Sequence, residues 1–142
     1  MTKIRVLLVD DEVDFAASLK KVLGRRGLNV TLAADGLTAL PLIAREHFDV
    51  VVLDIKMPGM DGIQVMSEIK RFSPDIPVIL LTGHYSSSKE EDTLKAGAYA
   101  YLLKPYPVLD LVKVIVAAAS DKDTRSDSSA KAQDPPQSVK PH

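Results

Sequence analysis

Acidic, hydroxyl and ammonium side chains stand at the ends of short apolar runs in this chain. Asp10 and Asp11 follow one run, Asp54 follows another, Thr82 ends a third and Lys104 comes directly after a fourth. Carboxylate oxygens without sulfur ligands suit a hard cation such as Mg²⁺. A metal ion and an ammonium group together neutralise charge on a moving phosphoryl group, and a carboxylate can be its acceptor. The residue types therefore predict phosphoryl-transfer chemistry.

Each of these residues also has an ordinary structural interpretation when taken alone. Asp11 or Glu12 could cap a helix, Asp54 could cap a loop, and Lys104-Pro105 could form a turn. Three carboxylates brought together would repel one another and would have raised pKa values unless a cation lay among them. Because these groups recur at the ends of several runs, a shared site explains them better than separate caps and turns do.

The elements that must position these groups follow from the hydrophobic pattern. Continuous apolar runs are typical of strands covered on both faces, and strands are expected at residues 4–9, 30–33, 50–53, 78–81 and 99–103. Helical periodicity lies between and after them, at residues 13–26, 37–46, 63–72, 87–96 and 108–119. This alternation predicts an α/β fold, a doubly wound five-stranded parallel sheet flanked by five helices. Ligands bind such sheets at the carboxyl ends of the strands, where the polar groups are expected.

Pro41 breaks the pattern of the second helical segment. If that helix starts near Gly36 or Leu37, the proline removes an early hydrogen bond and kinks or shortens the helix. If the helix starts late, the proline lies near its first turn, where it is tolerated. The sequence leaves both interpretations open.

The chain of 142 residues is long enough for one domain, expected at residues 3–120. Residues 121–142 have balanced charges, three prolines and Val139 as their one large apolar residue. Such a segment buries too little apolar surface to offset its ordering entropy, so a disordered tail or a truncated linker is expected there.

Composition excludes several functional classes. The formal net charge is −1, which gives no basis for direct nucleic-acid binding or capture by an anionic membrane. The absence of cysteine excludes disulfides, thiolate zinc sites and cysteine nucleophiles. No apolar run approaches the roughly 20 residues that span a bilayer, and the start of the chain does not resemble a secretory signal. A cytoplasmic protein is expected.

Five motifs in order resemble the receiver domain of two-component response regulators. They cover most of the expected domain and lie at residues 9–12 (VDDE), 51–62 (VVLDIKMPGMDG), 77–83 (PVILLTG), 95–98 (KAGA) and 101–106 (YLLKPY). The resemblance implies the flavodoxin-like receiver fold. It also implies that Asp54 is the phosphoacceptor, and that the phosphoryl donor is a sensor histidine kinase or a phosphotransfer protein.

The resemblance also assigns the remaining site residues. Asp11 would bind Mg²⁺ directly, Asp10 would bind it largely through water, and Asp54 and the backbone carbonyl of Lys56 would complete the protein ligands. Thr82 and Lys104 would hold the phosphoryl oxygens. In this family the peptide bond before the proline, here Lys104-Pro105, is cis.

The resemblance implies that Thr82 and Tyr101 transmit the signal. Tyr101 would be the aromatic switch, three residues before Lys104. The surface made by the fourth helix, the fifth strand and the fifth helix would then contact an unknown output domain or partner. Leu94 is the one aliphatic residue larger than alanine between Tyr85 and Tyr99, which predicts low local stability in that segment. The chain is expected to be a monomer or a phosphorylation-dependent homodimer.

Other functions fit the sequence less well. A haloacid dehalogenase-type phosphohydrolase would have an Asp-x-Asp pattern where residues 10–12 read Asp-Asp-Glu. A dinucleotide-binding domain would need a glycine-rich loop after the first strand, and a calcium loop would need alternating oxygen ligands. A degenerate receiver would have lost one of the acidic pair, the acceptor or the lysine, and all are present. Because the expected reaction acts on the chain's own aspartate, the protein is not expected to be a conventional enzyme.

Overall fold

A computed structural model describes residues 3–55 and 61–127, with side chains as far as residue 121. Its five strands pair in parallel in the order β2-β1-β3-β4-β5. The strands are β1 (Arg5–Val9), β2 (Asn29–Ala33), β3 (Val50–Leu53), β4 (Val78–Thr82) and β5 (Ala100–Leu103). The helices are α1 (Val13–Arg25), α2 (Gly36–Arg45), α3 (Gly62–Phe72), α4 (Ser87–Lys95) and α5 (Val108–Asp127). This arrangement confirms the predicted fold class.

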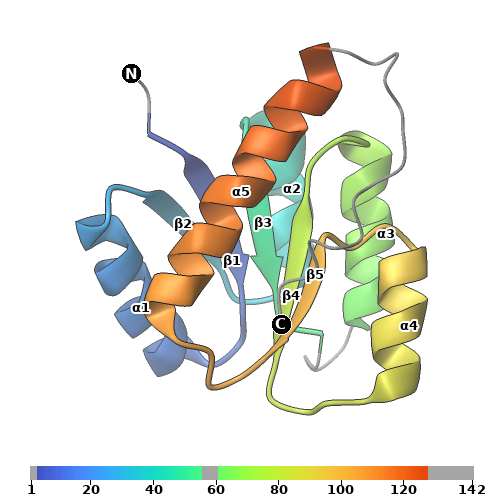
Figure 1. The fold of residues 1–142 in the computed structure, drawn as a ribbon, viewed down its shortest axis with the longest axis horizontal. Helices are drawn as coiled ribbons and strands as arrows, with labels where there is room; N and C mark the ends of the chain where they lie inside the picture. Colours follow the sequence, from blue (N-terminus) through green and yellow to red (C-terminus); the bar gives the residue numbers. More distant parts are fainter. Residues whose placement is uncertain (1–2, 56–60, 128–142) are drawn as a thin grey trace.

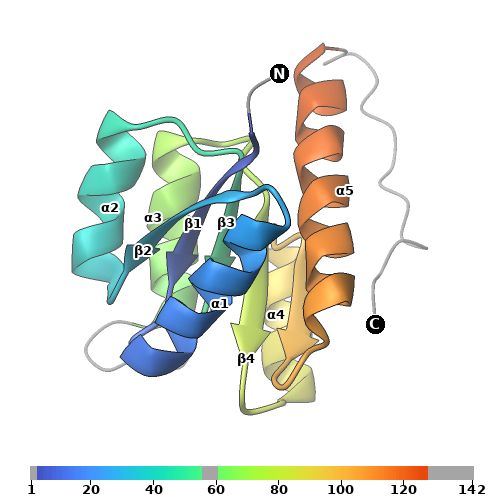
Figure 2. The ribbon, with the colours of Figure 1, turned by 90° about the vertical axis from the view of Figure 1, so that its left-hand side faces the viewer.

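Two apolar cores lie on opposite faces of the sheet. Along β1, Val6 and Leu8 belong to one core and Leu7 and Val9 to the other, because successive side chains of a strand point to opposite faces. Helices α1 and α5 cover the first core, whereas α2 and α3 cover the second (Figures 1 and 2). Burial on both faces explains why the strands read as continuous apolar runs.

The start of α3 is held tightly against the end of β3. The Asp61 side chain accepts a hydrogen bond from the backbone N–H of Ile63 at 3.0 Å and so caps the helix. The next residue, Gly62, donates its backbone N–H to the carbonyl of Ile55. A Cβ atom at Gly62 would overlap Ile55 Cα and would lie 2.8 Å from Ile55 Cβ. Only glycine permits this approach of the helix to the chain that leaves β3.

Pro41 lies inside α2, so the interpretation that this helix starts late is wrong. The helix begins at Gly36, where the Asp35 side chain accepts from Thr38 N–H at 2.8 Å. This cap satisfies one of the free amides of the first turn, and it lowers the pKa of Asp35. The exposed Pro41 cannot donate to the preceding turn, yet the helix continues to Arg45.

Helix α5 continues through residues 121–127, beyond the expected end of the domain at residue 120. Its extension is tied to the sheet, since the Tyr99 hydroxyl donates to Asp121 Oδ2 at 2.8 Å. No glycine or proline interrupts this stretch, and adding residues to an existing helix is easier than starting one. The rest of the predicted tail, residues 128–142, lies outside the described residues. Within the described ranges, α5 and the other helices are too short or too polar to cross a membrane.

Candidate functional site

The parallel register brings the predicted site residues to one edge of the sheet. Val9 of β1 is paired with Leu53 of β3, and the Asp54 backbone N–H donates to the Val9 carbonyl at 3.0 Å. Asp10 and Asp54 are thus neighbours just beyond their strands. At the ends of β4 and β5, the backbone N–H of Lys104 donates to the Thr82 carbonyl at 2.7 Å. The strand ends therefore gather the groups that the sequence places far apart.

Lys104 is the centre of the site. Its Nζ lies 2.9 Å from Asp10 Oδ2, 2.7 Å from Glu12 Oε1 and 3.5 Å from Asp54 Oδ2. Its side chain is only 13% exposed, and its ammonium lies 4.4 Å from the centre of the Phe15 ring. The lysine is therefore enclosed by three carboxylates and one aromatic face.

The pKa of Lys104 is raised above its ordinary value. Burial alone would lower it, but the hydrogen bonds to Glu12 and Asp10 and the charges of Asp54 and Asp10 outweigh that effect. The same contact lowers the pKa of Glu12. The site therefore keeps a fixed positive charge beside Asp54 at neutral pH.

Asp10, Glu12 and Asp54 form an oxygen-donor set that suits a hard cation. Each offers one carboxylate oxygen, and these oxygens lie within 4.8 Å of one another. Asp10 and Asp54 are 3% and 6% exposed, so their charges need a partner of opposite sign. Asp10 Oδ1 also accepts from the Glu12 backbone N–H at 2.9 Å, which fixes the orientation of that carboxylate.

The geometry adds Glu12 to the residues predicted from the sequence. From the sequence, Glu12 was interpreted only as a candidate helix cap. Its contact with Lys104 is visible only in the folded structure. Asp11 is half-buried and lies outside the three-carboxylate set, so its direct contact with a metal stays a prediction. The predicted carbonyl ligand, Lys56, lies outside the described residues.

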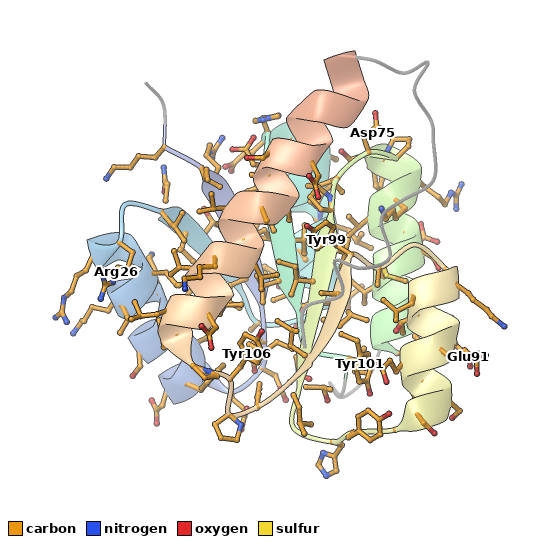
Figure 3. All side chains as sticks on the ribbon, in the orientation of Figure 1. Arg26, Asp75, Glu91, Tyr99, Tyr101 and Tyr106 are labelled. Carbon is orange, nitrogen blue, oxygen red and sulfur yellow. The ribbon has the colours of Figure 1, made fainter. Side chains whose placement is uncertain are left out.

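Thr82 and Tyr101 are joined through the loop between β4 and α4. Thr82 is fully buried and its Oγ1 accepts from the His84 N–H at 3.2 Å. The Tyr101 hydroxyl donates to the His84 carbonyl at 3.4 Å, and its ring packs edge-on against Tyr85. The Tyr101 side chain extends from β5 toward α4 (Figure 3) and the residue is 8% exposed. This burial raises the pKa of Tyr101. The peptide bond Lys104-Pro105 is cis, as expected.

Comparison with known proteins gives the family. The model of the response regulator receiver domain matches residues 6–116. A curated relative, the transcriptional regulatory protein ZraR of Klebsiella oxytoca, is 41% identical over 103 residues, which are 72% of this chain and 23% of that protein. The chain spans less than half the length of the first curated relatives it matches.

Solved structures agree with the sequence matches. A CheY-like response regulator receiver domain protein from Methanospirillum hungatei JF-1 has a TM-score of 0.83 at 31% identity, covering 87% of this chain and 99% of that one. A response regulator from Burkholderia pseudomallei, solved with a phosphorylated aspartic acid and a calcium ion, has a TM-score of 0.76 at 27% identity, covering 90% and 75%. The fold, the strand-end residues and the matched family model agree, and the chain belongs to the family of response regulator receiver domains.

Proposed function

We propose that Asp54 accepts a phosphoryl group from the phosphohistidine of a sensor histidine kinase or a phosphotransfer protein. The observation that carries this proposal is a buried carboxylate at the end of the central strand with an ammonium 3.5 Å away. An Asp54 carboxylate oxygen forms the new bond to phosphorus as the bond from phosphorus to the donor imidazole nitrogen breaks, and that nitrogen keeps the electron pair. The related Burkholderia protein carries a phosphorylated aspartic acid.

The cation we propose for this site is Mg²⁺, held by oxygens of Asp10, Asp11 and Asp54, with the Lys56 carbonyl as a further expected ligand. When bound, Mg²⁺ supplies positive charge opposite the phosphoryl oxygens. The chain's own residues do the rest. Thr82 offers a hydroxyl and Lys104 an ammonium to the phosphoryl oxygens, and the apolar walls around β3 limit the access of water.

Phosphorylation would signal through Thr82, Tyr101 and α4. A phosphoryl group that accepts from the Thr82 hydroxyl and draws the side chain toward Asp54 would lengthen the bond from the His84 N–H to Thr82 Oγ1. The Tyr101 hydroxyl donates to the carbonyl of the same histidine, so the displacement would reach Tyr101. The proposed reading surface is made by α4, β5 and α5, and its partner is an output domain or a separate protein. We expect the chain to act in the cytoplasm as a monomer or a phosphorylation-dependent homodimer, with no direct contact to nucleic acid or membrane.

The proposed reaction does not make the protein a conventional enzyme. It acts on the chain's own Asp54, and it ends when water attacks the acyl phosphate and releases inorganic phosphate. No free metabolite is turned over in this scheme. The protein would be a phosphorylated signal carrier with a self-limiting lifetime.

Intact-mass measurement after incubation with a small phosphodonor and Mg²⁺ tests the proposal. The wild-type chain should gain one phosphoryl group, whereas Asp54→Asn should gain none. Asp75→Asn is the matched control, because this exposed aspartate precedes β4, whereas Asp54 follows the carboxyl end of β3. Figure 3 shows Asp75 far from Tyr101, which lies on the side of the strand ends that carry the site. Equal labelling of Asp54→Asn would exclude the assignment, and full labelling in the presence of a chelator would exclude the metal.

A further inference from the structure

Glu12 makes the shortest contact of the Lys104 ammonium, although the proposed reaction assigns it no role. The distance to Glu12 is 2.7 Å, against 3.5 Å to the acceptor Asp54. An ammonium has three N–H donors, and Glu12 and Asp10 each take one at full hydrogen-bond distance. The lysine is thus engaged mainly by carboxylates other than the one that would carry the phosphoryl group.

The local structure directs the Glu12 side chain to this contact. Glu12 is the N-cap residue of α1, yet its side chain makes no capping hydrogen bond. Its backbone N–H is instead held by Asp10 Oδ1 at 2.9 Å, so the backbone is fixed while the carboxylate reaches Lys104. The Phe15 ring, 4.4 Å from Nζ, occupies a further direction around the ammonium. Lys104 is therefore held from several directions at once.

We propose that Glu12 is a positioning residue that restrains Lys104 and slows phosphorylation of Asp54. This inference rests on the proposed function. For Lys104 to bond a phosphoryl oxygen on Asp54, its ammonium must weaken or leave the Glu12 contact. A contact made before the reaction and lost during it stabilises the starting state alone, which raises the barrier. Glu12 therefore lowers the rate at which Asp54 is phosphorylated.

The size of the effect follows from the exposure of the pair. The Glu12 side chain is 60% exposed and the Lys104 side chain 13% exposed. Ion pairs with one solvated partner contribute little, so removing Glu12 should speed phosphorylation by about two- to fivefold. A direct metal-ligand role for Glu12 predicts the opposite result, because loss of a ligand would weaken Mg²⁺ binding and slow the reaction.

Two substitutions separate restraint from simple charge. Glu12→Gln keeps the length of the side chain and removes its charge, whereas Glu12→Asp keeps the charge and shortens the reach by one methylene. Initial rates of phosphorylation by a small phosphodonor are measured at saturating Mg²⁺, together with the half-saturating Mg²⁺ concentration. Restraint predicts faster reaction in both variants with an unchanged Mg²⁺ requirement. Acceleration in Glu12→Gln alone would mean charge repulsion only and would overturn the inference.

A double-mutant cycle with Lys104→Ala tests whether Glu12 acts through the lysine. The acceleration by Glu12→Gln should disappear in the Lys104→Ala background, because no ammonium remains to be released. An equal acceleration in both backgrounds, wild-type or slower rates in the single variants, or a raised Mg²⁺ requirement would each overturn the inference. Failure of the proposed function is separate, since it would appear as absence of labelling in the wild-type chain itself.

Discussion

Helices α3 and α4 differ sharply in how they are attached to the sheet. Helix α3 buries four residues, Gly62, Val65, Met66 and Ile69, whereas α4 buries only Thr93. Polar contacts lie near the start of α4, where Ser86 caps it and the Tyr85 hydroxyl donates to Glu90 at 2.9 Å. Helix α3 is therefore attached by apolar packing, whereas α4 contributes little buried apolar surface.

The difference matches the division of roles in the proposed function, between a fixed acceptor and a moving surface. Helix α3 begins against Ile55, the residue after the proposed acceptor Asp54, and so fixes the chain beside that residue. Helix α4 follows the loop that bonds both Thr82 and Tyr101, the part that is proposed to move. Segments with few buried apolar contacts open locally at low cost in free energy, which suits a responsive element.

Truncation of one aliphatic side chain in each helix gives the largest contrast. Ile69→Ala in α3 should lower the free energy of unfolding by about 2–5 kcal/mol, because it leaves a cavity in a fully packed core. Leu94→Ala in the half-buried part of α4 should cost about 1 kcal/mol or less. Urea denaturation of the two variants measures both values. Equal losses would contradict the difference in attachment.

Removal of the helix cap should affect global unfolding in α3 and local opening in α4. Asp61→Ala and Ser86→Ala each remove an acceptor for a first-turn amide, at a cost of about 0.5–2 kcal/mol to the helix. We expect the loss at Asp61 to appear in global unfolding. The loss at Ser86 should appear mainly as faster amide exchange within α4, since that helix opens on its own. Hydrogen exchange of both variants distinguishes the two outcomes, and faster exchange spread over the whole domain in Ser86→Ala would refute local opening.

High pH should slightly lower the free energy of unfolding through Tyr85 and Tyr101, the two tyrosines beside α4. Burial raises the pKa of Tyr101, and the Glu90 hydrogen bond raises that of Tyr85, both above the ordinary value of 10.0. The unfolded chain then loses these protons first, so the stabilisation is complete below pH 10 and is lost as the pH rises through the folded-state pKa. Unfolding curves in this range should show a slightly smaller loss for Tyr101→Phe than for the wild type. The raised pKa of Lys104 adds a similar loss to both proteins and cancels in the comparison. An identical pH dependence would show that Tyr101 does not contribute.

Much of this contrast was predictable from the sequence. The continuous apolar runs predicted the buried parallel strands, and Leu94 as the one larger aliphatic residue predicted a weakly attached α4. The burial of Thr93 was not predictable, because a threonine among charged residues reads as a surface position. Glu12 was missed because its position just before α1 is typical of a helix cap, whereas its side chain makes no capping bond and contacts Lys104 instead. The full length of α5 was missed because the composition of residues 121–127 indicates only whether that segment would order by itself. It does not show that the segment can extend a helix that has already formed.

The close approach of Gly62 to Ile55 has a consequence for mutational screens. A methyl group at this position must displace the backbone next to Asp54, whereas a Cβ at Gly83 meets nothing within 4 Å. A library selected for signalling would therefore reject every substitution at position 62 and accept alanine at position 83. The resulting tolerance map would mark Gly62 as strongly as an active-site residue, although it has no side chain to offer to chemistry. Intolerance at this position would report the cost of moving the backbone beside the proposed acceptor Asp54, not a role of position 62 in the proposed transfer.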